Sequence, residues 1–422
     1  MRIGLVGTRL AGVDGVSFET LKWELVLHRL GHETRLCAAE LPRGRDDGRL
    51  IPAMHFTHPP AMAVSAAAFD PAADASAVRR EVARLADELV PQLADWIEAD
   101  GIELLIVENA WAIPMHLPLG VALARLVAEL RLPTIGHHHD YAWERDRFAG
   151  CIVPDLLEAA FPPDLPTVRH VSINSLAAAE LERRRGISST IIPNAYEFEV
   201  EPPSRDDYSR SLRGELGMGT HNLLAVQPTR VVPRKGIELA IELLHRLNDP
   251  HAHLMITSPA GDEGLDYLSR LHVLADQLGV DLRYGADRFA HERWHHGDRM
   301  IFAVTDSYLE ADLITFPSLY EGFGNALIET VYFGKPLVVN RYTVYEADIR
   351  PLGFRFVEIE GAITDSTVAE VRDLIRDQER RAANAAHNFA IAREHLGFKM
   401  LQERLAAVID AVRFTSGAAA SG

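Results

Sequence analysis

The feature that most constrains the fold of this chain is a regular alternation of short apolar runs with longer helical patterns. The runs are apolar on both strand faces and are bounded by glycine, proline or polar residues. This is typical of parallel strands that are covered by helices on both sides. The strands predicted in this way are residues 3–6, 104–107, 223–226, 254–257, 313–316 and 337–339. Their alternation with helices predicts a doubly wound α/β fold.

A length of 422 residues predicts two or three domains. A polar segment that contains prolines and shows no apolar period is interpreted as a linker between two lobes. The predicted organisation is an N-terminal lobe at residues 1–195, the linker at 196–219, a C-terminal lobe at 220–385, a C-terminal helix at 386–414 that could return to the first lobe, and a tail at 415–422. A long surface loop is expected at residues 57–77, which are rich in Ala, Pro and Asp.

Charge and composition exclude several classes of protein. Lys and Arg number 43 against 60 Asp and Glu, and the resulting net charge of -17 argues against a nucleic-acid-binding protein. The only cysteines are Cys37 and Cys151, so no disulfide framework is expected. No stretch approaches the roughly 20 apolar residues of a membrane span, and no signal peptide is recognisable. We therefore expect a cytoplasmic protein without stable membrane insertion.

The first candidate site contains Arg230 and Lys235, which follow the strand predicted at 223–226. Cations at the carboxyl end of a parallel strand can hold a diphosphate, Arg through two hydrogen bonds and Lys as a point charge. The unpaired N–H groups at the start of the next helix would bind the same anion. The alternative is that both side chains are solvated surface charges.

The second candidate site contains Glu321, Gly322, Gly324 and Glu329, after the strand predicted at 313–316. The glycines allow the backbone to approach a ligand closely. The two carboxylates can accept hydrogen bonds from sugar or ribose hydroxyl groups. The alternative is one glutamate at a helix start and one exposed glutamate on the helix.

Taken together, Arg230-x4-Lys235 and Glu321-x7-Glu329 resemble the signature of the retaining glycosyltransferases of family four. Supporting matches are Gly-His-Glu at 31–33, Val-Ser-Ile-Asn-Ser at 171–175, Ile-Pro-Asn at 192–194 and Gly-Lys-Pro at 334–336. The resemblance covers nearly the whole chain. It implies the GT-B fold, in which two Rossmann-like lobes face a central cleft. The N-terminal lobe would bind the acceptor and the C-terminal lobe the donor.

The resemblance also implies an enzyme that transfers a hexose from a nucleotide-diphosphate sugar to a hydroxyl group with retention of configuration. Arg230 and Lys235 would neutralise the diphosphate, Glu321 would lie near the sugar hydroxyls, and Glu329 would bind the ribose. The implied donor site comprises Gly15, Arg230, Lys235, Gly322, Phe323, Gly324, Asn325 and Glu329. Because protein cations stabilise the leaving group, no metal and no other cofactor is expected.

His139 completes the expected catalytic set of His139, Arg230, Lys235 and Glu321. Family members often place a histidine near the transferred sugar, and the resemblance leaves open which of the histidines 137–139 matches that position. From the residues alone, a metal site is the alternative, because His137 and His139 share one strand face. No further ligand stands at a diagnostic spacing in the sequence.

The segment after these histidines combines aromatic rings, which can stack on a sugar, with cations that suit an acidic group. The expected acceptor residues are Asp14, Asp140, Tyr141, Trp143 and Arg147. This segment and Asn-Arg-Tyr at 340–342 resemble the family branch that contains synthases of the mannosylglucosylglycerate type. That implies GDP-mannose as donor, with UDP-glucose next, and a small anionic sugar as acceptor. The alternative is an ordinary amphipathic helix start.

Three further interpretations compete with this one. Residues 291–295 spell His-Glu-x-x-His, which could bind zinc on a helix, but their short polar context favours a surface loop. A transferase acting on a lipid or polysaccharide at a membrane surface would use a basic face, such as the arginines at 183–185. A sugar-nucleotide binder or an epimerase could share the fold, although both paired motifs are fully retained.

Overall fold

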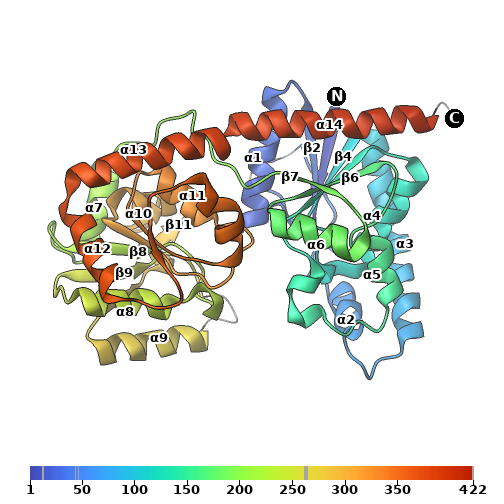
Figure 1. Ribbon diagram of the computed structural model, residues 1–422. Coiled ribbons are helices and arrows are strands. Elements are labelled where there is room, and N and C mark those ends of the chain that lie inside the picture. Colours follow the sequence, from blue (N-terminus) through green and yellow to red (C-terminus); the bar gives the residue numbers. More distant parts are fainter. Residues whose placement is uncertain (12–13, 43, 46, 261–264, 421–422) are drawn as a thin grey trace. The chain divides into compact units, whose positions relative to one another are not determined.

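The computed structural model describes residues 1–11, 14–42, 44–45, 47–260 and 265–420. The chain divides into two compact units, one formed by Met1–Ala195 with Lys399–Gly422 and the other by Tyr196–Phe398. Each unit is built on a parallel β-sheet with helices packed against it (Figure 1). The α/β class and the two Rossmann-like lobes expected from the sequence are confirmed.

The first unit contains a 7-stranded parallel sheet with the order β3-β2-β1-β4-β5-β6-β7. Its strands are β1 (Arg2–Val6), β2 (Glu33–Ala38), β3 (Arg49–Leu50), β4 (Leu104–Glu108), β5 (Thr134–His138), β6 (Val168–Ser172) and β7 (Ser189–Ile191). Its helices are α1 (Gly15–Arg29), α2 (Pro59–Ala67), α3 (Ala75–Ala99), α4 (Leu117–Leu130), α5 (Pro154–Ala160), α6 (Ser175–Arg185) and α14 (Phe398–Ala420).

The core of the first unit explains why its central strands read as continuous apolar runs. Every residue of β4 and β5 is buried, because the sheet is covered on both faces. Leu105 and Val107 of β4 lie in one apolar cluster with Trp96 of α3 and Leu123 of α4. The carboxyl ends of β4 and β5 therefore project from a rigid layer, which fixes the side chains that follow them.

The second unit contains a 6-stranded parallel sheet with the order β10-β9-β8-β14-β15-β16. Its strands are β8 (Leu223–Gln227), β9 (Ala252–Ile256), β10 (Asp281–Tyr284), β14 (Leu313–Phe316), β15 (Leu337–Asn340) and β16 (Val357–Ile359). Its helices are α7 (Asp207–Glu215), α8 (Ile237–Leu247), α9 (Leu265–Leu278), α10 (Val304–Glu310), α11 (Asn325–Tyr332), α12 (Asp365–Arg376) and α13 (Gln378–His395). A small sheet of β11 (Phe289–Ala290), β13 (Arg299–Ala303) and β12 (Trp294–His296) completes it.

All strands expected from the apolar runs are present, with shifts of one or two residues at their ends. The strand order of the second unit has one consequence for function. It places β8 beside β14, although 85 residues that include β9 to β13 separate Gln227 from Leu313 in sequence. Because parallel strands end at the same edge of a sheet, the loops that carry the two paired motifs are neighbours.

The segment 196–219 is not the irregular linker that we expected, because it contains α7. Asp206 caps this helix by accepting a hydrogen bond from the backbone N–H of Ser209. Leu212 is buried, the ring of Tyr208 packs on Phe302 with a centroid distance of 5.3 Å, and Arg213 donates to the backbone carbonyl of Glu310 at 2.7 Å and to Asp312 at 2.8 Å. Because the helix is short and is anchored partly by a buried arginine, its few apolar positions did not reveal it in the sequence.

Two further expectations about local structure are wrong. The segment 57–77 contains α2, whose Ala61 and Val64 are buried, so it is not a long loop. The single C-terminal helix expected at 386–414 is two helices, α13 and α14, which are interrupted at Leu396 and Gly397. The second of these continues to Ala420 and so includes most of the segment expected to be a tail.

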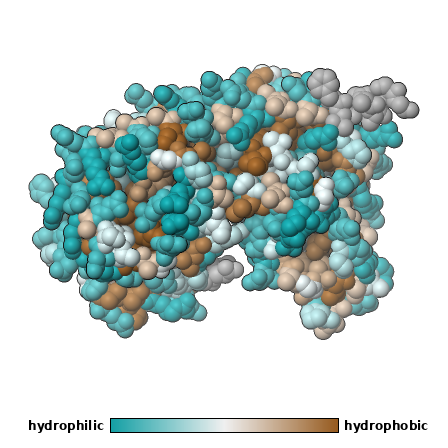
Figure 2. Space-filling view, in the orientation of Figure 1, coloured by the Kyte–Doolittle hydropathy of each residue, from teal (hydrophilic) through white to brown (hydrophobic). Residues whose placement is uncertain are grey.

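The hydropathy of the surface and the composition of the helices are the features that relate to membrane contact. On the face shown in Figure 2, hydrophilic residues predominate and hydrophobic residues form smaller patches between them. In the part of the chain that the structure describes, no helix has the length and apolar character needed to cross a bilayer.

Candidate active site

The loops after β8 and β14 meet through a buried ion pair. Lys235, at the end of a short 3-10 helix (Pro233–Lys235), donates a hydrogen bond from Nζ to Oε1 of Glu321. A neighbouring cation, Arg234, donates from a terminal guanidinium nitrogen to Oε2 of the same carboxylate at 3.0 Å. Lys235 and Glu321 are only 8% and 7% exposed, whereas Arg234 is partly open to solvent. One carboxylate therefore orders two cations at the edge of the sheet.

The pKa values of both partners of this ion pair, Lys235 and Glu321, are lowered. Burial acts to raise the pKa of Glu321, but the charges of Lys235 and Arg234 outweigh it and hold that pKa below its usual value. Burial lowers the pKa of Lys235, and the charges of Arg234 and Arg230 act in the same direction, while Glu321 opposes them. Arg230 is exposed and follows β8 in the same loop. Lys235 and Arg234 thus share one carboxylate, and the charge of Arg230 acts on Lys235 from the same loop.

Backbone packing explains why these loops approach each other so closely. Gly236 has a φ of +59°, and a Cβ atom there would lie 2.5 Å from the carbonyl oxygen of Pro317. The backbone N–H of Leu319 donates to the carbonyl of Arg234 at 2.8 Å, which joins the two loops directly. A side chain at position 236 would push the loops apart and separate Lys235 from Glu321.

The glycine loop before α11 is shaped by a tyrosine from the next strand connection. Gly324 has a φ of +125°, and a Cβ atom there would lie 2.7 Å from the hydroxyl of Tyr342. The same hydroxyl donates a hydrogen bond to the backbone carbonyl of Phe323. This contact fixes the loop that leads into α11, which starts at Asn325. Such a helix start suits an anionic ligand.

Glu329 lies one turn farther along α11 and belongs to a different contact. Its Oε2 accepts a hydrogen bond from the hydroxyl of Tyr308, on α10, at 2.6 Å. Burial, together with the charge of Glu329, holds the pKa of Tyr308 well above its usual value, so this hydroxyl remains a donor. Tyr308 was missed from the sequence, because nothing in its spacing relates it to Glu329.

The three consecutive histidines at 137–139, at the end of β5, lie on two faces of the sheet. His137 Nδ1 lies 2.8 Å from Oε2 of Glu108, the last residue of β4, and His139 Nε2 lies 3.9 Å from the same oxygen. His138 lies on the other face, where its Nε2 is 2.8 Å from Nδ1 of His170. Burial lowers the pKa of His138 well below its usual value. Of the three, His139 is the least buried and His138 is an interior residue.

Residues expected at the start of α1 have a clear local role. Asp14 caps the helix by accepting from the backbone N–H of Ser17 at 3.1 Å, and it also accepts from Arg9 at 2.8 Å. Gly15 is the exposed first residue of the helix. Gly12 and Val13, the two residues before Asp14, lie outside the described residues.

The acceptor residues expected after the histidines do not form one exposed surface. Tyr141 has no exposed surface, belongs to an apolar cluster with Leu181, and shares a hydrogen bond of 2.9 Å with Ser172. Its predicted contact with a sugar is therefore corrected to a role in the core. The ring of Trp143 stacks on Tyr141 with a centroid distance of 4.6 Å, so it continues that packing.

The remaining two expected acceptor residues differ in exposure, since Asp140 is buried and Arg147 is exposed. Asp140 accepts hydrogen bonds from Asn109, at 3.2 Å, and from Arg145. The guanidinium of Arg147 lies over the ring of Phe148 at 4.6 Å. Arg145, one of the cations of the segment expected to bind the acceptor, pairs with Asp140.

The His-Glu-x-x-His segment is not helical. Trp294–His296 forms the exposed edge strand β12, and Arg293 joins Asp206 and Asp306 by ion pairs. The geometry of a zinc hydrolase is absent from this described segment, which is a polar surface hairpin instead.

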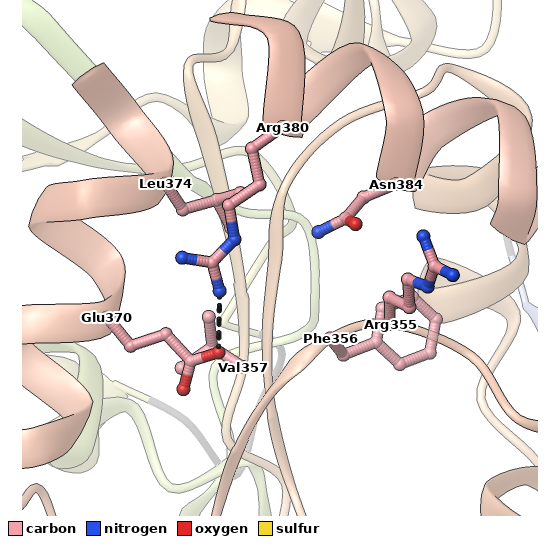
Figure 3. Close-up of a pocket in the computed structure, with 7 residues that line it drawn as sticks. All are labelled: Arg355, Phe356, Val357, Glu370, Leu374, Arg380 and Asn384. Atoms are coloured by element: carbon pink, nitrogen blue, oxygen red, sulfur yellow. Dashed lines mark hydrogen bonds and ion pairs between the residues drawn. The ribbon is translucent and has the colours of Figure 1, made fainter. Parts of the chain in front are cut away.

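Figure 3 shows a separate hollow of the second unit, between α12, α13 and the strand β16. It is lined by Arg355, Phe356, Val357, Glu370, Leu374, Arg380 and Asn384. Arg380 pairs with Glu370 at 3.3 Å across it. It contains none of the residues expected from the paired motifs.

Comparison with known proteins places both loops in the part of the chain that matches a known family. Residues 210–388, which contain both paired motifs, match the family model of glycosyl transferases group 1. The chain is 31% identical over 384 residues to a mannosylglucosylglycerate synthase of Petrotoga mobilis, a match that covers 85% of this chain and 86% of that protein. It is 29% identical to a mannosylglucosylglycerate synthase of Thermotoga maritima, over 96% of this chain and 99% of the relative.

Solved structures support the same architecture. The structure of Anabaena HepE in complex with UDP-glucose superposes with a TM-score of 0.67 at 15% sequence identity, covering 97% of this chain and 99% of that one. At this level of identity the likeness concerns the fold.

Proposed function

Since the chain belongs to the group 1 glycosyl transferases, we propose that it moves a hexose from a nucleotide-diphosphate sugar to a hydroxyl group of a small, anionic sugar acceptor, with retention of configuration. We favour GDP-mannose as the donor, with UDP-glucose next. The names of the two relatives describe a product with mannosyl, glucosyl and glycerate parts, and this supports a mannosyl donor and a carboxylate-bearing acceptor.

The observation that carries this proposal is the cation cluster around Glu321. Arg234 and Lys235 outnumber the single carboxylate that orders them, at a sheet edge where a helix also begins, and Arg230 follows the same strand. Negative charge develops on the leaving diphosphate during transfer, and fixed cations and N–H groups lower the energy of that state. No metal ion is needed at the diphosphate, because the protein supplies the positive charge.

In this proposal, Glu321 and Glu329 bind different parts of the donor. Glu321, at the glycine loop, accepts hydrogen bonds from hydroxyls of the transferred sugar, and Phe323, Gly324 and Asn325 bring backbone groups close to it. Glu329 accepts from the ribose hydroxyls, and Tyr308 orients it through the hydrogen bond of 2.6 Å.

The transfer step needs no protein nucleophile in this scheme. The acceptor hydroxyl attacks the anomeric carbon from the face that the diphosphate is leaving. The bond to the diphosphate oxygen breaks as the new glycosidic bond forms, and a phosphate oxygen takes the hydroxyl proton. His139 remains the residue of the first unit that we propose near the sugar, and Asp140 with Arg145 is the polar pair that we assign to the acceptor.

A direct assay with product analysis tests the proposal. GDP-mannose or UDP-glucose is incubated with a glycosylglycerate acceptor, nucleotide release is followed, and the anomeric configuration of the product is read by NMR. We expect an α-linked product from an α-linked donor. Lys235→Ala should abolish turnover in a folded protein, and Arg355→Ala is the matched control, since it removes a cation of the same unit from the hollow in Figure 3. Full activity of Lys235→Ala would overturn the diphosphate assignment.

A further inference from the structure

We propose that Glu108, His137 and His139 bind one divalent transition-metal ion at the carboxyl ends of β4 and β5. Each of the three side chains offers one ligand atom, and these atoms lie within 4.8 Å of one another. His137 and His139 are two positions apart, so they lie on the same side of the extended chain, and their ring centroids are 4.5 Å apart. Glu108 comes from the neighbouring strand, where its Cα position pairs with that of His137.

Unpartnered polar atoms inside the cluster point to a ligand. Oε1 of Glu108 and Nε2 of His139 are buried and have no hydrogen-bond partner. Glu108 is 2% exposed, and leaving a buried carboxylate oxygen without a partner is costly. Its ion-pair contacts are with the two histidines. A cation between the three side chains would satisfy the free oxygen and the free nitrogen together.

The surroundings hold the ligand side chains in place, as is common around metal sites. The indole ring of Trp23, on α1, stacks on His137 with a centroid distance of 3.9 Å and an interplanar angle of 19°. Asn109 accepts from the backbone N–H of His139 at 2.9 Å through its side-chain oxygen, and has a φ of +55°. The cluster is therefore ordered by its neighbours before any ion binds.

The donor set indicates the class of metal. Two imidazole nitrogens and one carboxylate oxygen suit Zn²⁺ or another first-row divalent ion, whereas Mg²⁺ and Ca²⁺ prefer oxygen ligands. In the bound form Nδ1 of His137 must carry no proton, so its hydrogen bond to Glu108 is exchanged for metal–ligand bonds. Three protein ligands leave at least one position for water or a substrate oxygen. His139 is the most exposed of the three ligand side chains.

This proposal replaces the expectation from the sequence that the chain binds no metal. Sequence reasoning paired His137 with His139 but lacked a third ligand, because Glu108 is the last residue of an apolar strand 29 positions earlier. The inference does not depend on the proposed transfer reaction, since all three ligands belong to the first unit and the diphosphate cluster belongs to the second.

Metal content measures the site directly. The untagged full chain is equilibrated with Zn²⁺, dialysed, and analysed by inductively coupled plasma mass spectrometry, and Co²⁺ is added in parallel to read its visible absorption. We expect one equivalent of Zn²⁺ in the wild-type protein and at least a tenfold weaker affinity in Glu108→Gln and in His139→Asn. The exposed histidines of the β12 hairpin could bind metal adventitiously, so His295→Ala with His296→Ala is the control, which should keep the full equivalent.

Each outcome decides the proposal. The proposal is overturned if the wild-type protein retains no Zn²⁺. It is also overturned if Glu108→Gln and His139→Asn each still bind one equivalent of Zn²⁺. If only the β12 double variant loses its equivalent of Zn²⁺, the metal is bound by the hairpin, and the proposal is again overturned. Nucleotide binding to the second unit, measured on the same samples with chelator, reports folding and tests the proposed function separately. If a variant is unfolded, the Co²⁺ absorption of the wild-type protein still shows whether nitrogen ligands hold the ion.

Discussion

The Nζ atom of Lys235 donates a hydrogen bond to Oε1 of Glu321, and this buried contact joins the loops that follow β8 and β14. The pair keeps the lysine ordered at the place where we propose that the diphosphate binds. We expect the diphosphate to share Lys235 with Glu321, because the amine carries three protons and can donate to both. Without a bound donor, the side chain of Lys235 is therefore held in place by Glu321, the residue that contacts the sugar in our proposal.

Arg234 should contribute to donor binding, although it stands at an unspecified position of the Arg230-x4-Lys235 motif. It donates to Oε2 of Glu321 and to the carbonyl of Tyr320, each at 3.0 Å. Arg234→Ala is expected to weaken the Kd of the nucleotide sugar by about tenfold, roughly 1.4 kcal/mol, because a charge-assisted contact is lost. Isothermal titration calorimetry measures this. Arg210→Ala, which removes an exposed arginine of α7, should leave the Kd unchanged. Equal effects of the two variants would contradict the assignment.

Tyr308 should act as a positioning residue for Glu329. Tyr308→Phe removes the hydroxyl that donates to Glu329 at 2.6 Å and should lower the free energy of unfolding by about 1 kcal/mol. We expect the KM for the nucleotide sugar to rise severalfold with little change in kcat, because in our proposal Glu329 contacts the ribose and not the reacting atoms. Tyr208→Phe, whose hydroxyl donates to backbone carbonyls near β12, is the control. A fall in kcat alone would be inconsistent with a contact to the ribose.

Tyr141 should affect stability without affecting the acceptor. Tyr141→Phe keeps the ring but removes the hydroxyl that bonds to Ser172, and it should cost about 1 kcal/mol of folding free energy in urea denaturation. The KM for the acceptor should remain as in the wild-type protein, since the side chain has no exposed surface. A raised KM with unchanged stability would restore Tyr141 to the acceptor site.

His116 should make the stability of the first unit depend on pH. Its Nδ1 caps α4 by accepting from the backbone N–H of Leu119 at 3.1 Å, and its Nε2 lies 2.9 Å from the carbonyl oxygen of Ala53. Burial, reinforced by the charges of His58 and His55, lowers the pKa of His116 from 6.5 to about 4. The unfolded chain therefore binds a proton at a higher pH than the folded chain does. Stability contributed by neutral His116 is complete above pH 6.5 and is lost as the pH falls towards 4, by about 3 kcal/mol.

A substitution separates the cap from the titration of His116. Asn is a good N-cap residue without an ionisable group, so His116→Asn should flatten the fall in unfolding free energy between pH 6.5 and about 4. Urea titrations at several pH values provide the comparison. An unchanged slope would mean that other groups dominate this range.

The sequence was informative wherever burial on both faces imposed a pattern. The strands β4, β8 and β14 follow directly from their apolar runs, and the spacing of the two paired motifs located the loops at their ends. The contact of Lys235 with Glu321 depends on β8 lying beside β14, and only the resemblance to a family related these distant segments before the structure did.

Other features depend on packing that no short pattern encodes. Tyr141 follows a strand and resembles a sugar-stacking residue, but its ring fills the space against α6. In the sequence, Glu108 is only the last residue of an apolar strand. In the fold, β5 places Nδ1 of His137 2.8 Å from its carboxylate. Helix α7 is anchored by Arg213, a residue that sequence patterns assign to solvent.

The most direct test of the central claim is a thermal-shift panel of GDP, UDP, ADP and their sugar conjugates, with chelator present, on the wild-type protein and on Lys235→Ala and Arg355→Ala. We predict that one nucleotide, with GDP favoured, raises the Tm of the wild-type protein and of Arg355→Ala, and that this shift disappears in Lys235→Ala. No shift with any nucleotide, or a shift that persists in Lys235→Ala, would contradict the proposal that the loops after β8 and β14 bind the donor diphosphate.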